Sequence, residues 1–65
     1  MAKHLSSVPA FQRADKRVTW DAAMKPVAQP QRVGTVFLSK GVSTMVRWDG
    51  DERLSQIATR ALVVV

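Results

Sequence analysis

The stretch that decides the fold runs from Arg32 to Gly50 and reads Arg-Val-Gly-Thr-Val-Phe-Leu-Ser-Lys-Gly-Val-Ser-Thr-Met-Val-Arg-Trp-Asp-Gly. Its residue pattern predicts one β-strand over residues 32–39 and a second over 43–48. Residues 39–42 would form the turn between them, with Gly41 free to adopt a positive φ. Asp49-Gly50 predicts a type I′ hairpin that reverses the chain again. Three successive antiparallel strands in so short a protein indicate a small, strongly bent barrel.

The side chains of these two strands divide into an inner and an outer set. Gly34, Val36 and Leu38 share one face of the first strand. Gly34 is the expected site of a bend or of a close approach between backbones, because it has no side chain. In the second strand, Val46 and Trp48 are expected to face the core.

The flanking sequence predicts two further strands. Residues 17–21 alternate, with Val18 and Trp20 on one face. Residues 22–31 contain Pro26 and Pro30 and are expected to form a long loop, since proline cannot donate to a sheet ladder. Residues 52–58 predict a fourth strand that cannot bury both Leu54 and Ile57 if it is regular, so a bulge or an early end of the strand is expected.

The two ends of the chain differ in character. Residues 59–61 fit a short helical turn, and Leu62–Val65 fit a fifth strand. We expect this strand to close the barrel; the alternative is a free valine-rich edge that would invite pairing with a partner. Residues 1–14 contain serine and proline and show little periodicity. We therefore expect a flexible basic N-terminal arm over residues 1–14 and a single domain over residues 15–65.

Residues 15–65 resemble the SH3-like small β-barrel, in particular its Tudor and KOW types. The resemblance rests on Gly34-Thr-Val36 and on Val46-Arg-Trp48-Asp-Gly50. It implies an all-β, five-stranded fold and a binding function, since such barrels bind RNA, DNA, modified tails, proline-rich peptides or one another. The plasmid-encoded type II dihydrofolate reductase shares the fold, but only Gln56 and Ile57 match its signature.

The composition indicates in which cellular compartment the protein is expected. The chain has 65 residues and no cysteine, so it has no disulfide and no thiolate metal site. Small secreted domains usually need disulfides, so we expect a cytoplasmic protein. The N-terminus has no apolar run typical of a signal peptide, and Ala61–Val65 is too short to span a membrane, so no membrane partner is expected. Small basic chains of this kind resemble phage and mobile-element products.

The charge is positive and unevenly distributed. Ten Lys and Arg against five Asp and Glu give a net charge of +5. Residues 1–32 hold six basic and two acidic residues, and residues 33–65 hold four and three. An excess of this kind favours an anionic partner and is typical of nucleic-acid binding, although charge also serves solubility.

No pattern indicates catalysis. His4 is the only histidine and lies in the expected arm without a partner for acid–base chemistry. Asp49, Asp51 and Glu52 lie at a turn and lack the spacing of a calcium loop. The three glycines are dispersed and form no phosphate loop. We expect no enzyme activity, no cofactor, no metal and no small-molecule substrate.

The first hypothesis is therefore a non-enzymatic module that binds DNA or RNA through its phosphates and reads little sequence. Binding would release counterions, and a base would stack weakly on Trp20 or Phe37. Arg47 and Arg53 flank the Asp49-Gly50 turn and are expected on one outer face. The candidate residues are Arg17, Trp20, Lys25, Arg32, Lys40, Arg47 and Arg53.

The alternative hypothesis is a small adaptor that binds a larger protein complex or a second copy of itself. Phe37 and Met45 would lie on the outer side of adjacent strands beside Val33. An exposed apolar group of this kind often marks an interaction surface.

Overall fold

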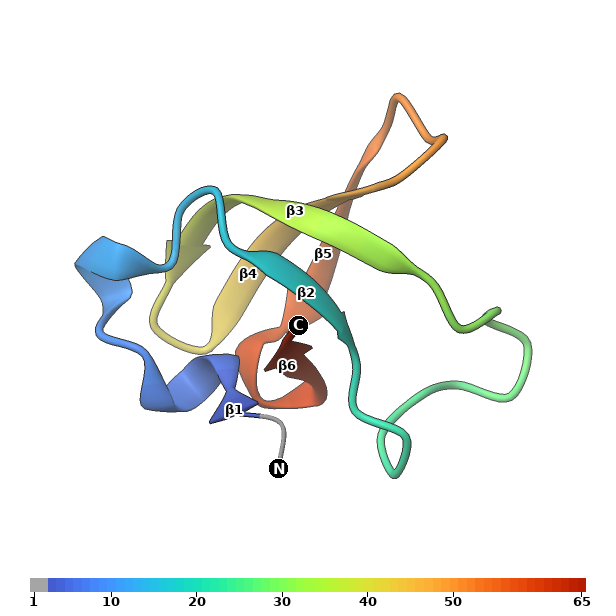
Figure 1. Cartoon of the computed structure of the whole chain (residues 1–65), viewed down its shortest axis with the longest axis horizontal. Helices are drawn as coiled ribbons and strands as arrows, with labels where there is room; N and C mark the ends of the chain where they lie inside the picture. The colour runs from blue at the N-terminus through green and yellow to red at the C-terminus, as the bar shows by residue number, and fades with distance from the viewer. Residues whose placement is uncertain (1–2) are drawn as a thin grey trace.

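The computed structural model describes residues 3–65 and shows an all-β protein built on one six-stranded antiparallel sheet (Figure 1). The strands follow the order β1-β6-β2-β3-β4-β5. β1 and β5 are the two edges and do not pair with each other, so the curled sheet is not closed by hydrogen bonds. The elements are β1 (Lys3–His4), η1 (Leu5–Ser7), η2 (Ala10–Gln12), β2 (Arg17–Trp20), β3 (Val33–Lys40), β4 (Ser43–Trp48), β5 (Leu54–Ala58), η3 (Thr59–Ala61) and β6 (Leu62–Val64), where η denotes a 3-10 helix.

Most elements expected from the sequence are confirmed. The three strands of the meander, β3, β4 and β5, lie side by side in the sheet. The loop with two prolines joins β2 to β3, and η3 is the short turn expected before the last strand. β6 lies between β1 and β2, so its valines form an inner strand and not a free edge.

Gly34 is a point of close approach, as its lack of a side chain suggested. A Cβ placed there would lie 2.7 Å from Val46 Cγ1, 2.8 Å from Trp48 Cε3 and 2.9 Å from the Arg47 carbonyl oxygen. Real Cβ atoms do not come so close, so only glycine fits at this position, where β3 pairs with β4. The break in the register occurs elsewhere, between Val36 and Leu38, which makes Phe37 the bulged residue.

The turn after β4 differs from the predicted type I′. That turn requires a positive φ at both central residues. Only Gly50 has one, with φ at 84°, while Asp49 is not left-handed. The Asp51 amide donates to the Trp48 carbonyl over 3.0 Å, which closes a turn with one left-handed residue. At the other hairpin, the expected positive φ of Gly41 is observed, at 57°.

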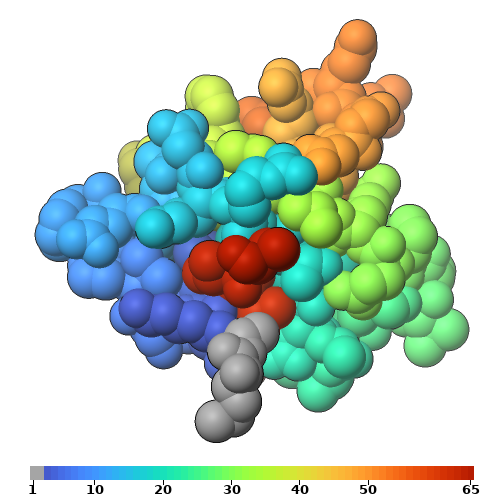
Figure 2. Space-filling view, viewed as in Figure 1, coloured from blue at the N-terminus to red at the C-terminus, as the bar shows by residue number. Residues whose placement is uncertain are grey.

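The expected flexible arm is wrong for residues 3–14, which are part of the folded domain. β1 pairs with β6 through Lys3 with Val64 and His4 with Val63. Leu5 is 0% exposed and belongs to the core cluster together with Val8. Figure 2 shows the N-terminal segment (blue) lying against the C-terminal strand (red) as part of one surface. Residues 1 and 2 lie outside the described part of the chain.

A buried arginine ties this segment to the β3–β4 hairpin. Arg13 Nε donates to the Val8 carbonyl over 2.7 Å, and its Nη1 donates to the Gly41 carbonyl over 3.0 Å. Thr59 Oγ1 donates to the same Gly41 carbonyl over 3.0 Å and lies 2.7 Å from Thr44 Oγ1. Because its donors are used inside the fold, Arg13 has a structural role and is not available to a phosphate backbone.

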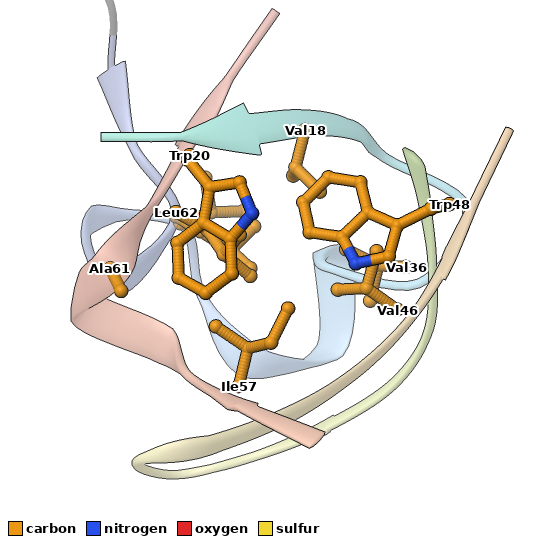
Figure 3. Close-up of a cluster of buried hydrophobic side chains, with 10 residues drawn as sticks. Val18, Trp20, Val36, Val46, Trp48, Ile57, Ala61 and Leu62 are labelled. Carbon is orange, nitrogen blue, oxygen red and sulfur yellow. The ribbon is translucent and has the colours of Figure 1, made fainter. Parts of the chain in front are cut away.

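The core sits inside the curl of the sheet and is centred on two tryptophans (Figure 3). The rings of Trp20 and Trp48 stack with their centroids 5.7 Å apart and an interplanar angle of 22°. The inward positions of β4 are confirmed, since Val46 and Trp48 are both buried. In β5 the register is uninterrupted, so Ile57 faces inward and Leu54 faces outward.

Candidate nucleic-acid interface

The outer face of β2 to β5 carries the candidate side chains in three rows across the strands. Residues that pair in register point to the same side of the sheet, and the inward rows alternate with the outward ones. The first outward row is the one nearest to the acidic turn after β4. It consists of Arg17, Thr35, Arg47 and Leu54.

The second and third outward rows lie toward the β3–β4 turn. Leu38, Met45 and Gln56 are paired in one, and Lys40, Ser43 and Ala58 in the other. The bulged Phe37 lies between the first and second rows along β3, and its side chain is 66% exposed.

The sequence predicts that Val33, Phe37 and Met45 form one apolar surface on this face, and the bulge in β3 changes which residues belong to it. Phe37 shares a surface hollow of about 470 Å³ with Leu54, Arg47 and two acidic residues, Asp15 and Glu52, so phosphate contacts are expected only on the side of Phe37 that faces Lys40. Met45 is half-buried and pairs with Leu38, which the bulge turns outward. Val33 instead pairs with Thr19 at the other end of β3. The exposed apolar strip is therefore Phe37, Leu38, Met45 and Leu54, and Val33 is not part of it.

Three of the predicted nucleic-acid contacts are engaged elsewhere in the fold. Trp20 is buried against Trp48, so its ring offers no stacking platform. Lys25 Nζ donates to the Gln29 carbonyl over 2.5 Å and stays within its own loop. Arg32 is half-buried, with its guanidinium carbon 5.2 Å from the centre of the Trp48 ring.

Arg17 is held by a carboxylate. Its Nη1 and Nη2 donate to the two carboxylate oxygens of Asp49 over 2.8 and 2.5 Å, and Nη1 also donates to Thr35 Oγ1 over 2.9 Å. The hydrogen bonds from Arg17 lower the pKa of Asp49 from its ordinary value, with a smaller contribution from the charge of Arg47. The same pair raises the pKa of Arg17. This bidentate pair fixes the β4–β5 turn to β2.

The lowered pKa of Asp49 gives the pair a defined pH dependence. A carboxyl group whose folded pKa is depressed stabilises the fold above its unfolded pKa of about 3.9, and this stabilisation is lost as the pH falls through the folded pKa. We expect Arg17→Gln to move the Asp49 pKa back up, toward its ordinary value. Carboxyl NMR titration of both proteins measures it, and an unchanged Asp49 pKa in Arg17→Gln would contradict the pairing.

Arg47 and Arg53 do not share the expected face. The register partner of Arg47 is Leu54, whereas Arg53 precedes β5 in the connecting turn. A second hollow, of about 560 Å³, surrounds Arg47 with Asp49, Asp51 and Glu52. Asp49 is already paired with Arg17, and the carboxylates of Asp51 and Glu52 remain beside Arg47, so this end of the face is mixed in charge and unfavourable to a phosphate.

The opposite end of the face is basic and holds no carboxylate among its described residues. Lys40 lines a hollow of about 200 Å³ with Leu38, Ser43, Met45 and Gln56. Arg60 lines a neighbouring one of about 490 Å³, whose other walls are Ser6, Gly41, Val42, Ala58 and Thr59. Within residues 3–65, neither cation forms a salt bridge. We call this region, Lys40 and Arg60 around the β3–β4 turn, the basic end.

Sequence reasoning missed Arg60. Its position in the short turn before the last strand was recognised, but its nearness to the β3–β4 turn was not. The Thr59 amide donates to the Val42 carbonyl over 2.8 Å, one position beyond the Ser43–Ala58 pair of β4 and β5, and this contact brings η3 to the hairpin.

Other kinds of site find no support in the described residues. No cluster of three or more His, Cys, Asp or Glu side chains within residues 3–65 is placed to hold a metal ion. The part of the chain that the structure describes also has no helix long and apolar enough to cross a bilayer. His4 Nε2 lies 2.7 Å from Asp21 Oδ2 and joins β1 to the end of β2.

Comparisons with known proteins return no match: no family model, no curated protein and no solved structure is similar to this chain.

Proposed function

We propose that this chain is a non-enzymatic module that binds single-stranded nucleic acid across the outer face of β3 to β5. The observation that carries the proposal is an exposed aromatic ring, Phe37, on the face that leads to a basic end without carboxylates. A positive groove beside a ring on which bases can stack is the usual arrangement for binding single strands with little sequence preference.

We also propose that the scaffold is an SH3-like small barrel. Five of its strands follow the order β6-β2-β3-β4-β5, in which a meander of four strands is joined by the last strand beside the first. A 3-10 turn, η3, precedes that last strand. β1 is then an addition outside β6, which extends the sheet at one edge.

In the proposed mechanism, phosphates pair with Lys40 and Arg60 and release counterions, while one base stacks on Phe37. Ser43 and Gln56 lie beside these side chains and add polar groups at the same surface, where Gln56 Nε2 donates to Ser43 Oγ over 2.8 Å. Arg47 contributes less because carboxylates surround it. The charged contacts go to phosphates, which carry no sequence information, so sequence preference is expected to be weak.

Anisotropy with a labelled 15-nucleotide poly(dT), at several salt concentrations, tests the proposal. Two phosphate contacts on a single strand give a slope of log K against log salt of about −1.4. Changing Lys40 and Arg60 together to glutamine is expected to bring this slope close to zero. Phe37→Ser is expected to weaken binding by about 1–3 kcal/mol while leaving the slope unchanged.

The matched control is Lys16→Gln with Arg53→Gln, which removes the same charge from exposed positions outside the basic end. Binding should be nearly unchanged in this control. An equal loss in both double variants would show that net charge, and not the basic end, drives binding. No binding at low salt would contradict the proposal as a whole.

A protein-binding function is the second candidate, favoured by the apolar strip of Phe37, Leu38, Met45 and Leu54. Leu54 is 41% exposed and Leu38 45%, and together with Phe37 they form an exposed apolar patch of the kind that marks an interaction surface. Phe37→Leu separates the two functions, since it removes base stacking but keeps the apolar contact. Apolar docking to a protein should be nearly independent of salt and should survive this change.

A further inference from the structure

A cavity on another part of the molecule, of about 190 Å³, lies between the β2–β3 loop and the edge strand β5. The two stacked tryptophans form part of its wall, and Ile57 lies beside them (Figure 3). It is lined by Trp20, Pro26, Gln29, Arg32, Trp48, Ser55, Gln56 and Ile57.

Two buried hydrogen-bond donors in this lining have no acceptor. They are Trp20 Nε1 and Arg32 Nε, and they are the only buried side-chain nitrogen or oxygen atoms without a partner among the described residues. Buried polar groups are nearly always hydrogen-bonded, because an unmade bond costs the full desolvation of the group. Two such donors on one small cavity point to an acceptor supplied from outside the chain.

The charge of the cavity identifies the kind of acceptor. Arg32 is the only charged residue of the lining, and no carboxylate of the chain lies there to neutralise it. Its Nη2 already donates to Gln29 Oε1 over 3.3 Å, and its guanidinium carbon lies over the Trp48 ring. Arg32 Nε therefore has no acceptor, and the Trp20 indole, whose donor also has none, lines the same cavity.

We propose that this cavity binds a carboxylate. A carboxylate carries one negative charge, matching the single arginine, and its two oxygens can accept from the two free donors. The walls formed by Trp20, Trp48, Pro26 and Ile57 suit a short aliphatic stem next to it. Such a group occurs on an acidic side chain or at the C-terminus of a peptide, and both present the same chemistry to the cavity.

This site adjoins the proposed nucleic-acid interface at one residue, Gln56, which lines both surfaces. The residues that carry the two proposals differ, since Trp20 and Arg32 supply the donors of the cavity, and Lys40, Arg60 and Phe37 do not line it. Loss of oligonucleotide binding would leave the carboxylate site intact, and the reverse also holds. The two proposals can therefore fail independently.

The test is a ¹H–¹⁵N NMR titration that follows the Trp20 indole signal of the full chain. The probes are a glutamate capped at both ends, N-acetyl-alanine for a C-terminal carboxylate, sodium phosphate, and sodium chloride at matched ionic strength. We expect a saturable shift of the Trp20 signal with at least one carboxylate probe. The capped glutamate and N-acetyl-alanine distinguish the two sources of the group.

Arg32→Gln is expected to weaken carboxylate binding about tenfold or more, since it removes a hydrogen bond to a charged group. Arg53→Gln is the matched control, because it removes the same charge at an exposed position and should leave the affinity unchanged. The proposal is overturned by a shift no larger than that in chloride, by a shift with phosphate alone, or by full binding in Arg32→Gln. The first two of these outcomes are measured on the wild-type protein alone, so they do not depend on whether a variant folds.

Discussion

Replacing Leu5 by alanine is expected to lower the free energy of unfolding by about 2–5 kcal/mol, the usual cost of truncating a buried leucine. Leu5 is fully buried and belongs to the same cluster as Leu62 and Val18. A domain of this size is stable by only about 3–10 kcal/mol, so the variant should be largely unfolded near its normal working temperature. Urea denaturation followed by tryptophan fluorescence measures the loss.

Phe11→Ala is the matched control for this result. Phe11 lies in the same N-terminal segment but is 83% exposed, so its truncation should change stability by no more than about 0.5 kcal/mol. If residues 3–14 were a flexible arm, both variants would behave alike. Equal, small effects of Leu5→Ala and Phe11→Ala would therefore contradict the folded N-terminal segment.

Gly34→Ala is the second substitution with a large expected effect. The added Cβ would meet Val46 Cγ1 at 2.7 Å and the backbone oxygen of Arg47 at 2.9 Å. Overpacking of this kind typically costs about 1–3 kcal/mol, and a backbone atom cannot move aside as a flexible side chain can. We expect a loss at the upper end of this range, measured as a lower urea midpoint.

A double variant tests whether crowding causes the loss. Val46→Ala removes one of the atoms that the new Cβ would meet, so Gly34→Ala with Val46→Ala should cost less than the sum of the two single changes. Gly50→Ala is the second comparison, because no atom lies within 4 Å of a Cβ there and only its φ of 84° is unfavourable. Wild-type stability of Gly34→Ala would show that β3 and β4 can separate without cost.

The positions of the strands were accessible from the sequence because they depend on local signals. Side chains of a strand point to opposite sides in turn, so Val46 and Trp48 share one face of β4, and their apolar character makes it the inner face. Gly41 marks a hairpin through its backbone freedom. Such features involve neighbouring residues only, and β2 to β5 and η3 were found through them.

The candidate site was less accessible, because a site is made of residues distant in the chain. Lys40 was recognised as a basic residue, but its neighbour Arg60 is brought to it by a contact between η3 and the β3–β4 turn. In the sequence Arg17 is one basic residue among several, whereas the folded sheet sets it against Asp49. The strand pattern leaves the exposure of the Trp20 ring undetermined, and packing against Trp48 buries it.

The sequence by itself determined the all-β class, the order of the meander and the positive charge of this protein. Only the tertiary structure decided that Leu5 and Val8 belong to the core, that Phe37 is the bulged and exposed ring, and that two residues with unpartnered donors, Trp20 and Arg32, line one cavity. The physical reason is the sequence separation over which each feature is determined. Strand patterns and turns follow from backbone preferences over a few residues, whereas burial, pairing of charges and unmade hydrogen bonds depend on which distant segments the fold brings together.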